Sequence, residues 1–492
     1  MLDRLADALD AFVPQVLRIT GAPGLSLAVE HRGETLERAY GWADLAARRP
    51  MSTSTLFPGG SMTKLYTAVA ILQLVEEGIV GLHDPVNSLL DDVDCTNPLG
   101  ARAVSVYDLL TFRSGLGVDT TACSLHDPPP LDEHVRGRLS SLRGQEYAGR
   151  VPRWTARVGE RYQYANLGIS ILGLIAERHS QAGASLADHF SRRILEPLGM
   201  QWSFLSDFAG GRPDGLSTGY ACFRDLRIPT PWLRSADHPA NGLMTTPGEH
   251  VRLLSALRRR GGGLLAPESV TRMLTPQVSM SADISPGGWW TGLVAILGNL
   301  GLPDRHFGQP GAHEWGWWNV SRAYPALDAA LSVSTNGWDM MRWHNPANPE
   351  AAVLVTEHVA AFLQHGVGAD TGWARRRAHL AGVILAERTH GLLGVPGPLP
   401  SELVREIAAR TVSTSGFDGE AFQAGLRLAG RQPVTPAAAA DLLAGNADQA
   451  LLLDLGGVYG FPAPLWVWGE ADEAVASWPE PSAASTARAM AS

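Results

Sequence analysis

The sequence predicts an α/β (α+β) fold in which helices flank one antiparallel sheet and an all-helical lobe is inserted into it. Short strand-like runs, bounded by turn residues, stand near the start of the chain and again after about residue 290. Between them, apolar residues recur at helical spacing. When strands stand near both ends of a chain, the simplest arrangement pairs them in one sheet.

The first predicted elements are a helix, a hairpin and a second helix. Residues 1–20 interleave apolar and acidic residues at the spacing of an amphipathic helix. The runs Leu25–His31 and Thr35–Tyr40 are typical of paired strands, because Arg32-Gly33 between them suits a tight hairpin turn. From Ser61 to Glu77, one apolar stripe predicts a helix.

The inserted lobe is predicted at about residues 80–285, with helices at Gly168–His179 and Leu186–Ile194. Strand patterns then return, and a helix follows them: the strands are Thr291–Leu297, Trp315–Ser321 and Ala330–Thr335, and the helix is Asn348–Gln364. A chain of 492 residues exceeds one ordinary core. We therefore expect a main domain at residues 1–366 and, from its Ala, Leu and Arg content, a mainly helical C-terminal region at residues 367–492.

Composition excludes several classes of function. The formal net charge of −9 comes without a long Lys/Arg block, which argues against a nucleic-acid partner. Cys95, Cys123 and Cys222 form no Cys-x-x-Cys pair, so neither a zinc ribbon nor a redox motif is indicated. The acidic N-terminal helix does not fit a signal peptide, and no run is long enough to cross a bilayer. We expect a cytoplasmic protein without a membrane partner, metal or cofactor.

The first chemical motif is Ser61-Met62-Thr63-Lys64, at the start of the helical stripe. A serine hydroxyl needs a base beside it to act as a nucleophile, and residues three apart share a helix face. At a helix N-terminus, Ser61 would also lie near free backbone N–H groups that stabilise an oxyanion. The same residues fit a plain serine cap with a lysine in the first turn, so the motif by itself does not establish catalysis.

Further segments extend this motif into a family pattern. Residues 1–366 resemble the serine β-lactamase and penicillin-binding-protein superfamily, and are similar to class C β-lactamases, family VIII-type esterases and related biosynthetic transacylases. The segments that carry the resemblance, in the family's order, are Pro23–Val29, Gly41–Leu45, Leu74–Gly78, Asp84–Val86, Leu109–Leu116, Gly159–Asn166 and Leu195–Met200. The resemblance implies a β-lactamase-like fold, with Ser61 as nucleophile and Lys64 as its proton-handling partner.

The family's second motif is a Tyr-x-Asn on the helical lobe, facing the serine, and Tyr164-Ala165-Asn166 matches it. This match implies that Tyr164 relays a proton between nucleophile and leaving group. Asn166 would bind a substrate carbonyl or orient Lys64. Whether Lys64 or Tyr164 activates the serine stays open. The alternative for Tyr164 is an ordinary buried tyrosine at a helix start.

The third family element is a Lys-Thr-Gly, or in many esterases a His-x-Gly, on a strand beside the serine. The similar stretch here is Phe307–Ala312, which puts Gln309 at the Lys/His position; His306-Phe307-Gly308 is an alternative register. Because glutamine is neutral, we expect weak handling of carboxylate-bearing β-lactams.

The resemblance also implies the groups that hold the substrate. The backbone N–H groups of Ser61 and Ala312 would form the oxyanion hole, which does not depend on side chains. Gln309 and Gly311 would line the substrate site. His313 is expected either in the cleft, in place of the missing cation, or as a brace of the strand.

Three functions are compatible with this pattern. The first is a serine hydrolase of esters or amides, and the second is a transacylase that passes the acyl group from Ser61 to an amine or alcohol. Both would act inside the cell, in specialised metabolism such as antibiotic biosynthesis. The third is a non-catalytic binding relative. A D-amino-acid peptidase or β-lactamase-type hydrolase is less favoured, because neither an export signal nor the third-motif cation is present.

Overall fold

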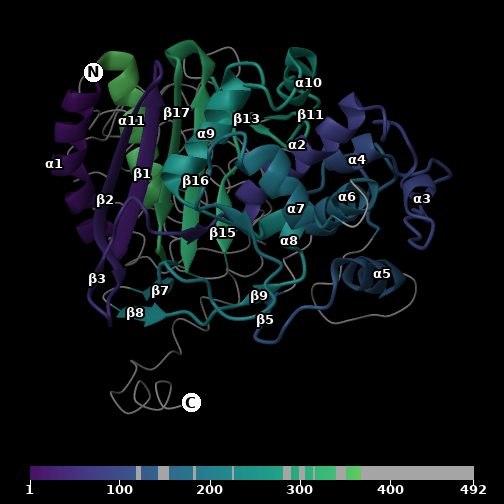
Figure 1. Ribbon diagram of the computed structural model, residues 1–492, viewed down its shortest axis with the longest axis horizontal. Helices are drawn as coiled ribbons and strands as arrows, with labels where there is room; N and C mark the ends of the chain where they lie inside the picture. The colour runs from purple at the N-terminus through teal and green to yellow at the C-terminus, as the bar shows by residue number, and fades with distance from the viewer. Residues whose placement is uncertain are drawn as a thin grey trace, which may run out of the picture. The chain divides into compact units, whose positions relative to one another are not determined.

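One ten-stranded sheet dominates the part of the chain that the structure describes (Figure 1). All described residues belong to one compact unit. The predicted C-terminal region, residues 367–492, lies outside them. The structure is a computed structural model that describes residues 1–117, 123–141, 154–180, 184–223, 226–280, 290–298, 305–313, 316–339 and 351–366.

Strands from both ends of this unit meet at the centre of the sheet, as the sequence predicts. β1 (Gly24–His31) pairs antiparallel with β2 (Glu34–Asp44) on one side and with β17 (Ala329–Thr335) on the other. Every residue of β1 and β17 is buried. The full order is β11 (Val278–Ser279), β12 (Trp290–Thr291), β13 (Ile296–Gly298), β14 (His306–Gly308), β16 (Trp317–Tyr324), β17, β1, β2 and β3 (Arg49–Pro50), with β15 (Gly311–His313) paired to β16.

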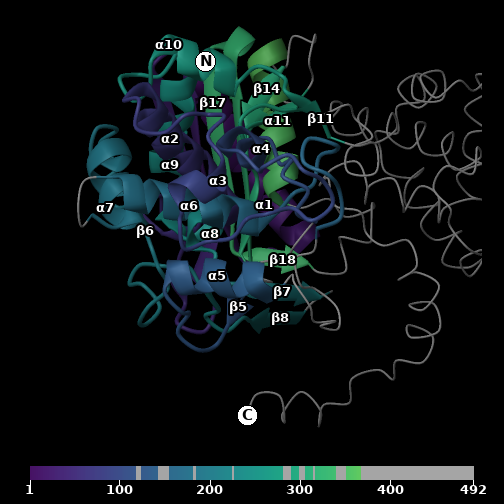
Figure 2. The same cartoon turned by 90° about the vertical axis from the view of Figure 1, so that its right-hand side faces the viewer.

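Helices cover both faces of the sheet (Figure 2). α9 (Pro247–Arg258) packs on one face, and α1 (Leu2–Thr20) and α11 (Ala351–His365) pack together on the other. The apolar stripe of α1 faces the core, because Leu5, Leu9, Val13 and Val16 are all buried. These helices confirm the predictions for residues 1–20 and for the described part of 348–364.

The helical lobe is built around two buried helices, α2 (Thr63–Glu76) and α6 (Asn166–His179). Smaller helices surround them: α3 (Val86–Leu89), α4 (Val106–Leu110), α5 (Leu131–Ser141), α7 (Leu186–Phe190), α8 (His238–Asn241) and α10 (Pro267–Met273). Short strands also lie among residues 80–285, so the lobe is mainly rather than purely helical. They are β5 (Cys123–Ser124), β6 (Phe204–Leu205), β7 (Tyr220–Phe223), β8 (Leu226–Pro229), β9 (Arg234–Ser235) and β10 (Leu243–Thr245). Two of them pair with strands from outside this range: β10 with β4 (Phe57–Pro58), and β7 with β18 (Gly337–Asp339).

Two predicted elements differ in their local form. The apolar run Thr291–Leu297 is not one strand, because the chain turns between β12 and β13, with Val294 at φ 67° and a hydrogen bond from Gly292 N to Ala295 O of 2.8 Å. The predicted helix Leu186–Ile194 consists of α7 and a π-helical turn at Ser191–Leu195. Apolar content predicted both segments as regular, but it does not specify where the backbone bends.

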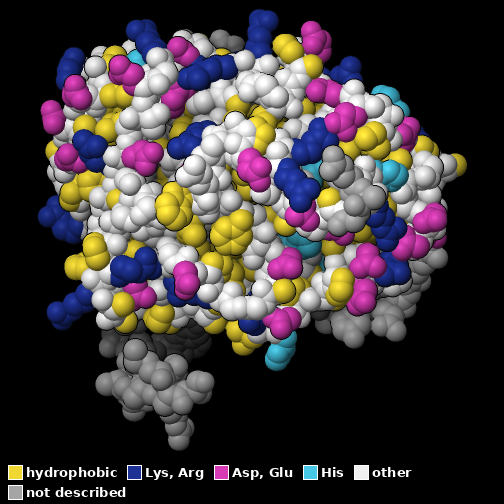
Figure 3. Space-filling model, viewed as in Figure 1, with side chains coloured by type: hydrophobic (Ala, Val, Ile, Leu, Met, Phe, Trp, Pro, Cys, Tyr) yellow, Lys and Arg dark blue, Asp and Glu magenta, His cyan; other side chains and the backbone are white. Residues whose placement is uncertain are grey.

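The surface and the cysteines are consistent with an ordinary folded domain. On the face seen in Figure 3, Lys/Arg and Asp/Glu side chains are interspersed. None of the described helices combines the length and the apolar character needed to cross a bilayer. Among the described residues, the buried Cys95 and Cys222 are in no disulfide. Burial raises the pKa of the Cys95 thiol to about 12, which keeps it unreactive.

Candidate active site

Ser61 lies at the junction of a short turn and a long buried helix. The turn is the 3-10 segment η1 (Gly60–Met62), which runs directly into α2. Its shape is fixed by β10, because Gly59 N donates to Leu243 O at 2.6 Å and Leu243 N donates to Thr63 Oγ1 at 3.0 Å. Thr63 Oγ1 in turn donates to Gly60 O at 2.6 Å. Ser61 itself is only half-buried, so its hydroxyl sits on a rigid support and remains reachable.

Lys64 lies one helical turn further on and points back at the serine. Its side chain is fully buried, and Nζ donates to Ser61 Oγ at 2.8 Å and to the backbone oxygen of Ala240 at 3.0 Å. The Ala240 carbonyl comes from the last turn of α8, so the short helix directs its acceptor end at the amine. Lys64 is also the only lysine in the chain. The structure therefore brings the predicted nucleophile and its predicted proton-handling partner into direct contact.

Tyr164 and Asn166 come from the other side of the lobe, at the start of α6. The Tyr164 ring lies with its centroid 4.9 Å from Lys64 Nζ. It stacks on Phe112 with ring centroids 4.9 Å apart and an interplanar angle of 22°. Asn166 is the first residue of α6 and is buried. Because α6 packs against α2, the Tyr164 ring of the second motif lies beside Lys64 of the first.

Gln309 joins the third motif to the second. It lies between β14 and β15, is buried, and donates from Nε2 to the phenol oxygen of Tyr164 at 3.2 Å. Its backbone oxygen accepts a hydrogen bond from Ser321 Oγ at 2.8 Å. His306, the alternative register, instead packs against Tyr324 with ring centroids 5.5 Å apart. Of the two registers, only the Gln309 alignment places a motif side chain at Tyr164.

The two segments predicted to form the oxyanion hole touch backbone to backbone. Gly60 has φ 54°, and a Cβ added to it would lie 2.1 Å from Ala312 O. A Cβ added to Gly311 would lie 1.9 Å from Gly59 O. Both glycines are therefore required by this close approach. The contact holds the backbone of Ala312 beside that of Ser61, which is the arrangement that two oxyanion donors need.

His313 does not supply the missing cation. It is buried among aromatic rings, parallel to Phe208 within 5° and at a centroid distance of 5.5 Å, and its Nε2 lies 3.2 Å from the Leu233 carbonyl oxygen. Burial lowers the pKa of this imidazole to about 4, so it is neutral near pH 7. We therefore correct the expectation that His313 lies in the cleft: its geometry is that of the structural brace.

Two functional contacts could not be recognised in the sequence. One is the Ala240 carbonyl, which any residue type could provide. The other is Asn319 in β16, which is fully buried and hydrogen-bonded to the segment before Ser61 and to Gly311. The one available signal is an asparagine inside the strand pattern Trp315–Ser321, because asparagine is uncommon in strands and a buried amide needs hydrogen-bond partners.

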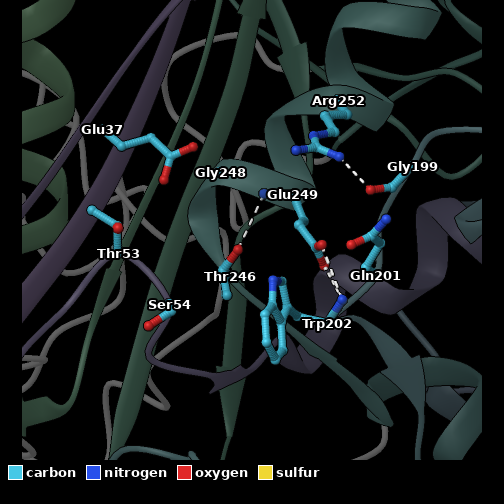
Figure 4. Close-up of a pocket in the computed structure, with 10 residues that line it drawn as sticks. All are labelled: Glu37, Thr53, Ser54, Gly199, Gln201, Trp202, Thr246, Gly248, Glu249 and Arg252. Carbon is cyan, nitrogen blue, oxygen red and sulfur yellow. Dashed lines mark hydrogen bonds between the residues drawn. The ribbon is translucent and has the colours of Figure 1, made fainter.

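A surface cavity of about 310 Å³ lies close by but is not the acyl site (Figure 4). It opens beside the first turn of α9, where the Glu249 carboxylate accepts the Trp202 backbone N–H at 3.0 and 3.1 Å. No motif residue lines it. Its walls are Glu37, Thr53, Ser54, Gly199, Gln201, Trp202, Thr246, Gly248, Glu249 and Arg252. Within the described residues, no group of three or more His, Cys, Asp or Glu side chains could hold a metal ion.

Comparison with known proteins agrees with this fold. A family model described as Beta-lactamase matches residues 3–392. The chain is 29% identical to Esterase EstB of Burkholderia gladioli over 370 residues, which is 68% of this chain and 90% of that protein. A penicillin-binding-protein homologue from Pyrococcus abyssi superposes with a TM-score of 0.59 at 23% identity, covering 76% of this chain and 81% of that one. EstCE1, a hydrolase with promiscuous acyltransferase activity, superposes with a TM-score of 0.57 at 19% identity, covering 69% of this chain and 95% of that one.

Proposed function

The chain belongs to the beta-lactamase family, and from this premise we propose that it is a serine hydrolase or transacylase in which Ser61 carries the acyl group of an ester or amide. The observation that supports this most directly is the 2.8 Å contact between Lys64 Nζ and Ser61 Oγ. An unprotonated lysine at that distance can take the hydroxyl proton as the oxygen attacks.

The first half of the reaction forms the acyl-enzyme. Ser61 Oγ bonds to the acyl carbon, its proton passes to Lys64, and the carbonyl oxygen becomes an oxyanion held by the backbone N–H groups of Ser61 and Ala312. When the tetrahedral intermediate collapses, the bond to the leaving group breaks and the leaving group takes a proton. Tyr164, whose ring lies 4.9 Å from Lys64 Nζ, is the side chain proposed to relay that proton.

The second half removes the acyl group. Water, or an amine or alcohol acceptor, attacks the acyl carbon, gives up its proton to the same groups and frees Ser61. The esterase relative supports hydrolysis, and the promiscuous acyltransferase activity of EstCE1 supports including transfer to an acceptor. Asn166 would hold a carbonyl of the acyl donor or orient Lys64, and Gln309 and Gly311 would line the donor site.

Gln309 favours an uncharged acyl donor over a carboxylate-bearing one. It is buried and neutral, and one of its two amide N–H groups donates to Tyr164 at 3.2 Å. A carboxylate is bound most strongly by a cation, which this position does not offer. A role in specialised metabolism and a cytoplasmic location stay predictions.

The test is intact-protein mass spectrometry with a series of p-nitrophenyl esters, with and without small amines. We expect a transient adduct in the wild type and none in Ser61→Ala. Ser88→Ala, which changes an exposed serine on α3, is the matched control and should behave as wild type. If amines speed the decay of the adduct and yield amides, the enzyme is a transacylase; if only water clears it, it is a hydrolase. Adduct formation that survives Ser61→Ala would refute the proposal.

A further inference from the structure

Asn319 binds the two backbone segments that meet at the proposed oxyanion hole. Its Nδ2 donates one hydrogen bond to Pro58 O at 2.9 Å and another to Gly311 O at 3.1 Å. Pro58 belongs to β4, just before the turn that carries Ser61, and Gly311 immediately precedes Ala312. One side-chain amide therefore links the segment that precedes Ser61 to β15.

The orientation of this amide follows from its surroundings. Both groups near Nδ2 are carbonyl oxygens, which only accept hydrogen bonds, so the nitrogen and not the oxygen of the side chain must face them. The two N–H bonds of Asn319 are thereby both used. Its oxygen, Oδ1, is buried and has no hydrogen-bond partner among the described residues.

An asparagine in this position is a poor choice for stability alone. The residue is completely buried in β16, and a buried oxygen without a partner costs free energy that an apolar side chain of similar size would not incur. What asparagine offers instead is a pair of directional bonds to two different segments. Gly311 lies directly opposite Asn319 in the pairing of β15 with β16, so the amide acts on β15, the strand that carries Ala312.

The glycine contacts alone do not fix this geometry. Gly60 and Gly311 let the backbones approach, as the distances of 2.1 and 1.9 Å from an added Cβ show, but neither glycine has a side chain that could stop the segments from sliding. Two hydrogen bonds from one rigid amide remove that freedom, because each weakens steeply when its angle changes.

We propose that Asn319 is a positioning residue for the oxyanion hole: it sets the distance between the backbone N–H groups of Ser61 and Ala312. This inference rests on the proposed function, and it concerns the tetrahedral intermediate rather than the bound substrate. Asn319 acts through Pro58 and Gly311 and contributes no proton.

The test compares Asn319→Leu and Asn319→Ser with the wild type. For an ester that the wild type turns over, we expect kcat of the leucine variant to fall by about 10- to 100-fold while KM changes by less than about 3-fold, because misplaced donors weaken transition-state binding only. The affinity for an arylboronic acid, which forms a tetrahedral adduct on the serine, should fall by the same factor as kcat. The serine variant keeps one donor and should recover part of both losses.

The matched control is Ser334→Ala. Ser334 is buried at the same depth, lies opposite Asn319 in β17, and has no described hydrogen-bond partner for its hydroxyl. We expect it to leave kcat and boronate affinity unchanged, whatever its effect on thermal stability. If Asn319→Leu does not fold, Asn319→Ser is compared with Ser334→Ala. The inference then requires that kcat and boronate affinity fall in Asn319→Ser and not in Ser334→Ala.

The outcomes separate this inference from the proposed function. Folded Asn319 variants with wild-type kcat and boronate affinity, or variants in which KM rises and kcat does not fall, would overturn the role of Asn319 while Ser61 chemistry stands. A wild type that neither turns over esters nor binds boronate any better than Ser61→Ala would overturn the proposed function itself, and the inference with it.

Discussion

Gln309 donates a hydrogen bond from its amide Nε2 to the phenol oxygen of Tyr164 across 3.2 Å, and both side chains belong to the group around Ser61. The third family motif therefore reaches the second through a neutral amide. A lysine at the same place would offer an ammonium both to the phenol and to a substrate carboxylate. We therefore predict that the residue at position 309 influences whether a carboxylate-bearing substrate is accepted.

We expect Gln309→Lys to raise kcat/KM for the carboxylate-bearing cephalosporin nitrocefin by about 10-fold, since a charge-assisted hydrogen bond adds roughly 1.5 kcal/mol or more. Wild-type turnover should be slow, and uncharged esters should gain nothing. The ratio of kcat/KM values for the two substrates measures the effect. Gln309→Met, which removes the hydrogen bond without adding charge, is the control. Wild-type nitrocefin turnover at the level of a dedicated β-lactamase would contradict this view.

Lys64 can be tested separately from all other amines, because it is the only lysine in the chain. We expect Lys64→Met to lower kcat by about 10²- to 10⁴-fold, the usual worth of a general base, and to abolish the adduct in mass spectrometry. Lys64→Arg should not restore activity, because a guanidinium keeps its proton. In a sample labelled with ¹³Cε-lysine, one resonance reports this side chain, and its titration should match the pH profile of kcat/KM. A titration that bears no relation to that profile would remove Lys64 as the base.

Local signals account for what the sequence could predict. The hairpin was readable because Arg32 and Gly33 both take positive φ, of 53° and 89°, as a two-residue turn demands. Helix spacing draws attention to Ser61 and Lys64, since residues three apart share a helix face, but the family resemblance supplies their roles, as it does for Tyr164 and Asn166. These inferences depend on a few neighbouring residues or on a complete motif.

Tertiary contacts account for what it could not predict. The sequence leaves His313 open between the cleft and a brace of the strand. Its surroundings, which favour the brace, come from Phe208, Trp232 and Trp317 in other parts of the fold. The Ala240 carbonyl reaches Lys64 only because α8 packs against the start of α2. No spacing rule contains such information, since it arises when separate elements pack together.

The close approach of Gly60 to Ala312 predicts that alanine at position 60 lowers activity and stability far more than alanine at position 33. Gly60→Ala would put its Cβ 2.1 Å from Ala312 O, so β15, the strand that carries Ala312, must move. The φ of 54° at position 60 is also unfavourable for alanine. We expect kcat to fall by more than about 10²-fold, as when an oxyanion donor is lost, with a drop in stability of about 2–4 kcal/mol. The control is Gly33→Ala, whose φ is 89° but whose Cβ would meet nothing within 4 Å. It should cost only about 1 kcal/mol in strain and leave kcat intact. Equal kinetic losses in both variants would show that close packing at Gly60 is not the cause.

Burial of His313 predicts a stability that depends on pH. The pKa of this imidazole is about 4 in the folded protein, against an ordinary value of 6.5. Between those values the unfolded chain binds a proton that the folded chain does not, so the free energy of unfolding falls as pH falls, by at most about 1.4 kcal/mol per pH unit from this group. Burial lowers the pKa of His250 to about 3 and that of His189 to about 4, so these side chains act in the same direction.

We therefore expect His313→Phe to lose less stability than the wild type between pH 7 and pH 5 in urea denaturation. A phenyl ring is planar, as the imidazole is, and can stack on Phe208 in the same parallel arrangement. The lost hydrogen bond to Leu233 O should lower stability by about 1 kcal/mol at both pH values. Turnover of His313→Phe should stay within about 3-fold of wild type if the imidazole only braces the strand. A large loss of turnover with unchanged unfolding would show that His313 takes part in the reaction and does more than brace the strand.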